Sequence, residues 1–193
     1  MEIGIWGDSI TYGACDSEGL GWVGRLRKTF PVADYDGVYN RGVCGDTVRD
    51  VLKRFPAEAE SIQPTIILFA FGLNDSKYLQ GKSENNIPLV EFKQKTEELV
   101  SLAKKYTKKI YILGGTKVDP AMENSTENRF VNTEIEKYNA VLVEIAETHG
   151  ATFVDLFGVL DTTTDLFDDK LHPNANGYQK LFTKIFSEIK DQF

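Results

Sequence analysis

The 193-residue sequence is poor in the residues and runs that mark several specialised classes of protein. Its two cysteines, Cys15 and Cys44, are too few for a disulfide framework and lack the spacing of a zinc or redox motif. We expect two reduced thiols, with a bridge or a reactive thiol as the alternative. No segment approaches the ~18 consecutive apolar residues of a membrane-spanning helix, so we expect no membrane span.

Clustered basic charge is also missing. The chain has 29 acidic and 22 basic residues, a formal net charge of -7, and no stripe of Lys and Arg that could follow a phosphate backbone. We therefore expect no nucleic acid partner. A first strand starting at about Glu2 leaves no room for a secretory leader, which predicts a cytoplasmic protein unless a leader has been removed. Nothing in the sequence specifies an oligomeric state.

What the chain does contain is a regular alternation of strand and helix patterns. Strands are predicted within residues 3–7, 38–47, 64–71, 108–114 and 151–154. Apolar residues at helical spacing predict helices over 22–30, 48–55, 89–106, 131–149 and 178–189. This alternation favours a single α/β domain over residues 1–193, with a parallel sheet of five strands and helices on both of its faces.

Prolines and long polar connections divide this pattern. Pro31 is expected to end the first helix, and Pro56 to interrupt or kink the second. The connection over 115–130 is long for a compact domain, which is typical of lids and specificity elements. Together with 76–88, it is where we expect substrate specificity to be determined.

Small polar residues follow the predicted strands in four places: 7–9, 42–47, 72–75 and 168–173. The carboxyl ends of parallel strands share one edge of the sheet, where ligands bind in open α/β folds. Ser9 stands in the first of these segments, where its hydroxyl can be presented to a substrate. A serine nucleophile needs a base, an orienting acid and donors for an oxyanion, and the other three segments can supply them.

The chain has only two histidines to serve as a base. His149 falls in the last turn of a predicted helix, where a cation suits the helix dipole and a structural role is favoured. His172 lies in a loop before a proline, with Asp169 three residues earlier. That spacing can place a carboxylate on one ring nitrogen and leave the other for a serine hydroxyl, although the pair could equally be surface turn residues.

Three groups can donate to an oxyanion. These are the backbone N–H of Ser9, the backbone N–H of Gly45 and the side-chain amide of Asn74. Each has a structural alternative, since Gly45 can make a tight turn and Asn74 can close one. Asp8 and Asp75, beside these donors, can be turn residues in the same way.

Four short motifs occur in the order and rough spacing of a known family: Gly7-Asp8-Ser9, Gly45, Gly72-Leu73-Asn74-Asp75 and Asp169-Lys170-Leu171-His172-Pro173. In this respect the chain resembles the SGNH (GDSL-type) hydrolases. The resemblance implies a flavodoxin-like three-layer α/β/α sandwich and ester hydrolysis without a metal or organic cofactor. By position it makes Ser9 the nucleophile, His172 the base and Asp169 its orienting acid, with an oxyanion hole formed by Ser9, Gly45 and Asn74.

The chain departs from the family pattern at two positions. Leu73 stands where glycine or threonine is usual, and Cys44 precedes Gly45 where many members carry a serine. We expect the first change to affect local shape and the second to place a thiol in the pocket. The sequence around Ser9 also lacks the G-x-S-x-G elbow, which argues against the larger α/β-hydrolase fold.

Several other functions remain open from the sequence. A flavodoxin-like flavin-binding protein would use 7–11 as a phosphate loop. A cysteine hydrolase would pair Cys44 with His172, a metallohydrolase would use Asp8, Asp75, Asp169 and His172, and any such fold can serve as a non-catalytic scaffold. For the esterase we expect a small-molecule substrate, a short-chain or acetyl ester that can be carried on a sugar, with thioesters and lysophospholipids as alternatives.

Overall fold

The sheet is five-stranded and entirely parallel, as predicted. A computed structural model describes residues 1–30 and 37–192. The strands follow the order β2-β1-β3-β4-β5. Their bounds are β1 Glu2–Gly7, β2 Gly37–Gly42, β3 Ile66–Ala70, β4 Ile110–Leu113 and β5 Thr152–Val154.

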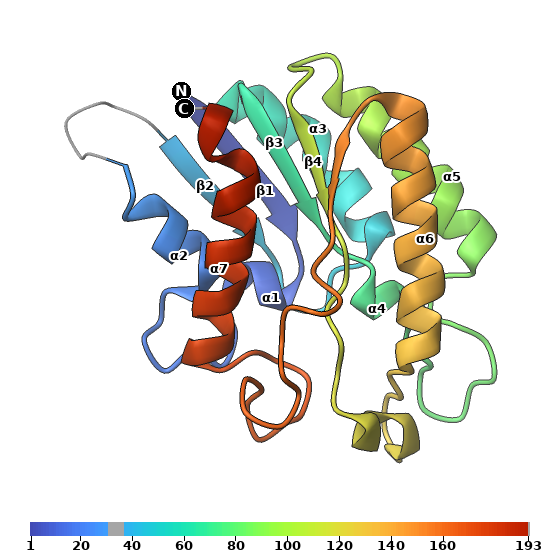
Figure 1. Ribbon diagram of the computed structural model, residues 1–193. Helices are drawn as coiled ribbons and strands as arrows, with labels where there is room; N and C mark the ends of the chain where they lie inside the picture. The colour runs from blue at the N-terminus through green and yellow to red at the C-terminus, as the bar shows by residue number, and fades with distance from the viewer. Residues whose placement is uncertain (31–36, 193) are drawn as a thin grey trace.

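Helices cover both faces of the sheet, which gives the expected three layers (Figure 1). On one face pack α2 (Gly21–Arg27) and α7 (Ala175–Ile189), and on the other α3 (Val48–Ile62), α5 (Leu89–Ala103) and α6 (Asn132–His149). Short helices lie elsewhere: α1 Ser9–Tyr12, α4 Leu73–Ser76, and the 3-10 helices η2 Pro120–Asn124 and η3 Lys190–Gln192. No helix in the described part of the chain is long and apolar enough to cross a bilayer.

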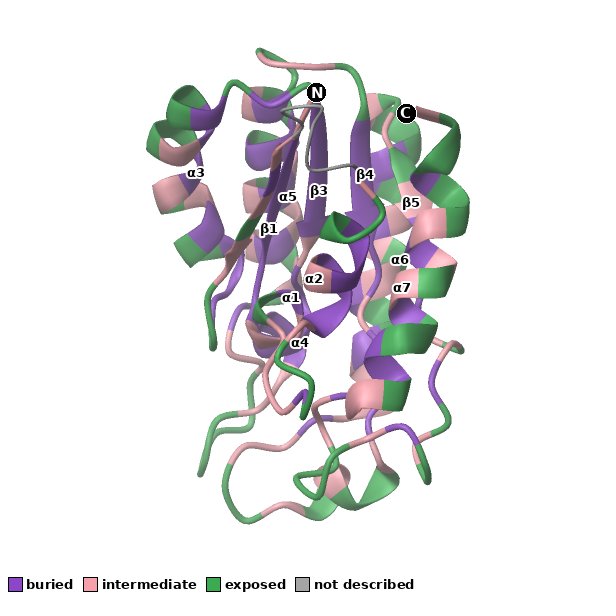
Figure 2. Cartoon of the chain, turned by 90° about the vertical axis from the view of Figure 1, so that its left-hand side faces the viewer, coloured by how far each residue is buried: buried purple, intermediate pink, exposed green. Residues whose placement is uncertain are grey.

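Apolar side chains on both faces of the inner strands hold the layers together. Ile3 and Ile5 of β1 pack with α2 and α7, whereas Trp6 of the same strand packs with α3. The continuous apolar run of β3 divides in the same way, with Leu68 on the first face and Phe69 on the second. All five side chains are buried, and Figure 2 shows the buried colour concentrated on the strands and the inner helix faces. Burial on both faces explains why these strands lack polar alternation.

One helix differs from its prediction at a proline. Helix α3 runs through Pro56 to Ile62, so the expected interruption does not occur. Proline removes one i to i−4 hydrogen bond, which usually ends a helix. Here the buried stripe continues past the proline, from Val51 and Phe55 to Ala59, and its packing holds the helical turn together.

Other helix ends shift by a few residues. Helix α2 ends at Arg27, before the expected Phe30, and Pro31 lies outside the described residues. Helix α5 ends at Ala103, three residues earlier than predicted, because residues 104–106 form a turn. Helix α7 begins three residues earlier than predicted, where the side chain of Asn174 accepts the N–H of Gly177.

Candidate active site

Ser9 lies directly after the first strand, where the chain turns from β1 into the short helix α1. Asp8 caps this helix, because its Oδ1 accepts a backbone N–H of the first turn at 3.0 Å. The turn requires glycine at position 7, since a Cβ there would lie 2.2 Å from Oγ1 of Thr11 and 2.3 Å from the carbonyl oxygen of Ala70. The Gly-Asp-Ser order therefore presents Ser9 at the carboxyl edge of the sheet.

His172 reaches Ser9 from the loop between β5 and α7. Its Nε2 lies 2.8 Å from Oγ of Ser9, and its Nδ1 lies 2.6 Å from Oδ2 of Asp169. Oδ1 of Asp169 accepts the N–H groups of Leu171 and His172 at 3.0 Å, and Lys170, which follows Asp169, adopts φ 63. The tight turn thus aims the imidazole, and the structure brings all three predicted residues into one hydrogen-bonded series.

The carboxyl groups near this series differ in their readiness to ionise. Burial of Asp169 opposes its ionisation, but hydrogen bonds from the side chain and backbone of His172 outweigh burial and lower its pKa. Burial raises the pKa of Asp8 to about 6 and that of Asp75 to about 7. Among these three carboxyl groups, Asp169 is therefore the one that ionises most readily, and it is the one within hydrogen-bond distance of Nδ1 of His172.

The three predicted oxyanion donors lie around one cleft. Ser9, Gly45, Asn74 and His172 all line an open cleft of about 260 Å³. Gly45 adopts φ 88, and its N–H has no hydrogen-bond partner among the residues that the structure describes. Nδ2 of Asn74 lies 3.2 Å from the carbonyl oxygen of Asp46, so one of its two hydrogens remains for a ligand.

Asp8 and Asp75 have structural roles instead of a shared metal site. Asp8 caps α1, and Oδ1 of Asp75 accepts the first backbone N–H of α3 at 2.9 Å. Within the described ranges, the side chains close enough to share a metal ion are those of Cys15, Asp169 and His172. The four-residue metal set considered from the sequence is therefore not formed.

The cysteines and the second histidine also have defined places. Cys15 and Cys44 are both free cysteines. Sγ of Cys15 lies 3.7 Å from Oδ2 of Asp169, and the exposed Cys44 lines the cleft. Burial and the nearby charge of Asp169 raise the pKa of Cys15, which keeps its thiol protonated. His149 ends α6, as predicted, and does not line the cleft.

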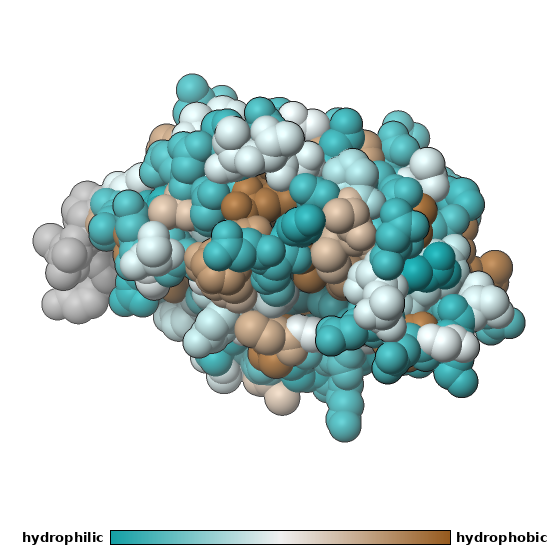
Figure 3. Space-filling model, turned by 90° about the horizontal axis from the view of Figure 1, so that it is seen from below, coloured by the Kyte–Doolittle hydropathy of each residue, from teal (hydrophilic) through white to brown (hydrophobic). Residues whose placement is uncertain are grey.

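The two long polar connections meet at this cleft. Tyr78 of 76–88 forms a β-bridge with Arg129 of 115–130, and the guanidinium of Arg129 lies 4.6 Å from the centroid of the tyrosine ring. The two segments together contribute three residues to the cleft, Lys77, Asn128 and Phe130. Figure 3 views this end of the molecule and shows apolar patches within a mainly hydrophilic face.

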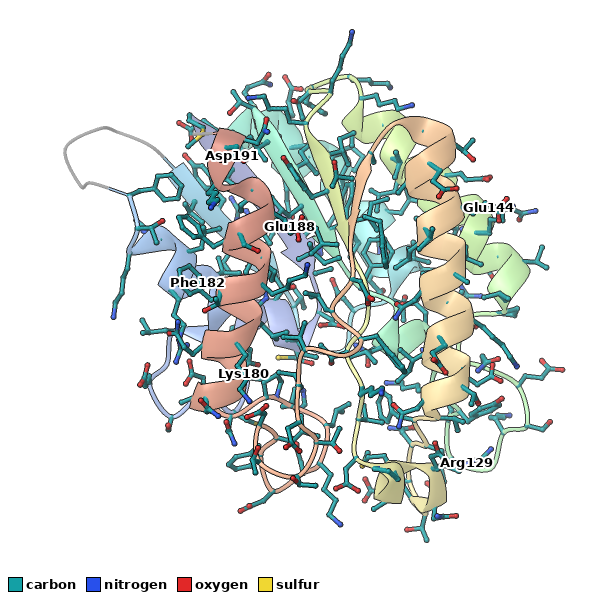
Figure 4. All side chains as sticks on the ribbon, viewed as in Figure 1. Arg129, Glu144, Lys180, Phe182, Glu188 and Asp191 are labelled. Carbon is teal, nitrogen blue, oxygen red and sulfur yellow. The ribbon has the colours of Figure 1, made fainter. Side chains whose placement is uncertain are left out.

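Sequence reasoning missed Asp165, which anchors the loop that carries His172. Its carboxylate is completely buried and accepts from Nζ of Lys180 at 2.6 Å and Nδ2 of Asn176 at 2.7 Å. Both partners lie on α7, where Figure 4 labels Lys180 near the lower end of the helix. An aspartate in a loop rich in Asp and Thr gave no signal for this role. Lys77 was missed as well, although it stands only three residues after Asn74.

Known proteins resemble this chain in both sequence and structure. An acetylxylan esterase from Geobacillus stearothermophilus is 26% identical over 205 residues, which cover 95% of this chain and 91% of that protein. The crystal structure of a lipase/acylhydrolase from Enterococcus faecalis superposes with a TM-score of 0.79 at 27% identity, covering 99% and 96% of the two chains. The structure called TesA matches in fold, with a TM-score of 0.80 at 21% identity and complete coverage of both chains.

An all-parallel α/β sandwich with serine, histidine and aspartate joined at its carboxyl edge is an arrangement suited to acyl transfer. The profile of the GDSL-like lipase/acylhydrolase family matches residues 5–180, and the chain belongs to this family. The resemblance inferred from the four short motifs is thereby confirmed. Membership and the esterase relative place the protein among the carboxylic ester hydrolases.

Proposed function

We propose that this protein is an esterase in which Ser9 is the nucleophile, His172 the general base and Asp169 the acid that orients His172. The observation that carries the proposal is the hydrogen-bonded series from Asp169 to His172 to Ser9, with contacts of 2.6 and 2.8 Å. Such a series activates a hydroxyl that is otherwise a weak nucleophile.

The reaction follows from this geometry in two halves. Oγ of Ser9 attacks the ester carbonyl carbon while Nε2 of His172 takes the hydroxyl proton. The tetrahedral intermediate then expels the alcohol, which receives that proton from His172, and an acyl-serine remains. Water next loses a proton to His172 and attacks the acyl carbon. The second intermediate breaks the bond between that carbon and Oγ, His172 returns its proton to Oγ of Ser9, and the carboxylic acid is released.

The oxyanion of both intermediates would be held by the N–H groups of Ser9 and Gly45 and by Nδ2 of Asn74. The cleft position of all three residues supports this assignment, as does the unpartnered N–H of Gly45. Ser9 is the first residue of α1, where backbone N–H groups lack intrahelical partners.

The substrate that we propose is a short-chain ester, in particular an acetyl ester carried on a sugar. The cleft of about 260 Å³ suits a small acyl group, and the acetylxylan esterase relative supports an acetylated carbohydrate. Amide and aromatic side chains on its wall, Asn128 and Phe130, can bind and stack on a sugar ring. Thioesters and lysophospholipids are the competing substrates in the test below.

Hydrolysis of p-nitrophenyl acetate by wild-type protein and by Ser9→Ala tests the proposed nucleophile. We expect Ser9→Ala to lose at least about 10³-fold in kcat with an unchanged melting temperature. Cys44→Ala is the matched control in the same cleft, and its activity should be retained. Activity that survives in Ser9→Ala and disappears in Cys44→Ala would instead establish a cysteine hydrolase, and a yellow protein without esterase activity would establish a flavoprotein.

The proposed substrate needs a separate comparison. A series of p-nitrophenyl esters from acetate to laurate should show kcat/KM highest at the short end, and an acetylated xylo-oligosaccharide should be deacetylated. A maximum at long acyl chains, or greater activity on acyl thioesters or lysophospholipids, would contradict the proposed substrate while leaving the roles of Ser9 and His172 intact.

A further inference from the structure

Lys77 brings a cation to the cleft directly behind the amide of Asn74. Its Nζ donates to Oδ1 of Asn74 at 3.0 Å and lies 5.9 Å from the ring centroid of Phe130. The backbone on either side is tied down, because the carbonyl of Lys77 accepts the N–H of Asn86 at 2.8 Å and Tyr78 pairs with Arg129. The side chain therefore starts from a paired backbone and ends in a hydrogen bond to Asn74.

Among the residues that the structure describes, no carboxylate lies within ion-pair distance of this ammonium, although the side chain is partly buried. Burial lowers the pKa of Lys77, while the charges of Asp75 and Asp8 oppose that change. Lysines that are fully buried are almost never left without an acid, and this partly buried one donates to a neutral amide, which suggests that the contact has a role of its own.

The side-chain amide of Asn74 makes a hydrogen bond at its oxygen and another at its nitrogen. An ammonium can only donate, so it requires the oxygen of the amide, and the carbonyl of Asp46 can only accept, so it requires the nitrogen. The two contacts specify the same orientation of the amide. A charged donor on Oδ1 also polarises the amide and makes the remaining Nδ2–H a stronger donor.

We propose that Lys77 is a positioning residue that acts through Asn74, fixing and polarising the amide that donates to the oxyanion. This inference rests on the proposed function, since it requires an oxyanion at the cleft. It predicts that Lys77 contributes to the chemical step and little to substrate binding. Removal of an oxyanion donor typically costs about 10²–10³ in kcat, and loss of its positioning group should cost a part of that, about 10-fold.

A double-mutant cycle tests this coupling. Lys77→Met, Asn74→Ala and the double variant are compared with wild-type protein on p-nitrophenyl acetate. We expect Lys77→Met to lower kcat about 10-fold with KM changed less than about 2-fold, and to have no further effect once Asn74 is alanine. Lys77→Arg, which retains a donor, should recover most of the lost activity.

Lys117→Met is the matched control. Lys117 lies in the connection 115–130, and its Nζ also lies over an aromatic ring, 4.9 Å from the centroid of Phe157. It should leave kcat unchanged, and all single variants should melt near the wild-type temperature. Equal losses from Lys77→Met with and without Asn74 would overturn the coupling. If Lys77→Met raised KM only for esters that carry a carboxylate, the positioning role would be overturned, and Lys77 would instead bind the anionic group of the substrate. Failure of the proposed function would appear separately, as full activity in Ser9→Ala.

Discussion

Nε2 of His172 lies 2.8 Å from Oγ of Ser9, although the two residues are 163 positions apart in the chain. The parallel sheet makes this contact possible, because the turn after β1 and the loop after β5 open at the same edge. Asp165 and the α7 residues that it contacts then hold the second loop in place. The contact therefore depends on the whole sheet, so loss of activity on unfolding should coincide with loss of secondary structure.

Replacing Asp169 by asparagine should damage catalysis and leave the fold intact. The amide oxygen can still accept the two backbone N–H groups that form the turn, but an amide nitrogen would face Nδ1 of His172. That contact favours the tautomer of His172 that carries its proton on Nε2, and a protonated Nε2 cannot accept the hydroxyl proton of Ser9. We expect kcat for p-nitrophenyl acetate to fall about 10³–10⁴-fold with a melting temperature close to wild type.

Asp168 supplies the control for this substitution, because it is exposed and adjacent in sequence. Asp168→Asn should retain wild-type kcat. Full activity in Asp169→Asn would show that His172 does not need this carboxylate, and a large fall in melting temperature would show that the residue serves the turn more than the imidazole.

The buried Asp75 should make stability depend on pH. Its pKa is raised from 3.8 to about 7 by burial, so between these values the folded protein binds more protons than the unfolded chain. The free energy of unfolding should therefore fall as pH rises from about 4 to about 7. Asp75→Asn cannot ionise and keeps an oxygen for the N–H of Val48. Above pH 7 it should be more stable than wild type, by on the order of 2 kcal/mol.

Urea unfolding at pH 5 and pH 8 measures this difference. The loss of stability between the two pH values should be smaller in Asp75→Asn than in wild type, and Asp168→Asn should match wild type. Asp8, whose pKa burial raises to about 6, should supply a residual slope in the variant. An identical pH slope in wild type and Asp75→Asn would contradict the assignment.

The sequence predicts the sheet and the core of the site because both leave strong local signals. The run of β3 has no polar residue to divide it, and the motif around Ser9 stops a strand at a glycine. His172 could be chosen because the only other histidine ends a helix. Individual side-chain contacts leave no comparable signal, since no periodicity indicates that Lys77 donates to Asn74 or that Asp165 pairs with Lys180. The predicted interruption of the helix at Pro56 is wrong because tertiary packing outweighs the local preference of proline.

Asp165→Ala should destabilise the protein strongly. The completely buried carboxylate accepts from Lys180, from Asn176 and from the backbone N–H of Asp161 at 2.8 Å. Its removal leaves polar groups without acceptors around the loop that carries His172, at a cost of about 3 kcal/mol or more. Lys180→Met removes one of the three donors and leaves Asn176 and the N–H of Asp161 on the carboxylate, so it should cost less than Asp165→Ala. Urea unfolding of both variants measures the difference, and equal losses would contradict a central role for Asp165.

Gly42→Ala should disturb Ser9 from outside the site. A Cβ at position 42 would lie 2.2 Å from the backbone nitrogen of Tyr12 and 2.7 Å from the carbonyl carbon of Thr11, both in α1. Because these are backbone atoms, α1 itself must move, and its first residue is Ser9. We expect lower stability and a fall in kcat greater than the change in KM, since the hydroxyl would no longer be aligned with His172. Gly158→Ala is the control, because a Cβ there meets nothing within 4 Å, and it should retain both properties. Wild-type kcat in Gly42→Ala would show that α1 can shift without moving the hydroxyl, and the close packing of β2 against α1 would then have no part in presenting the nucleophile.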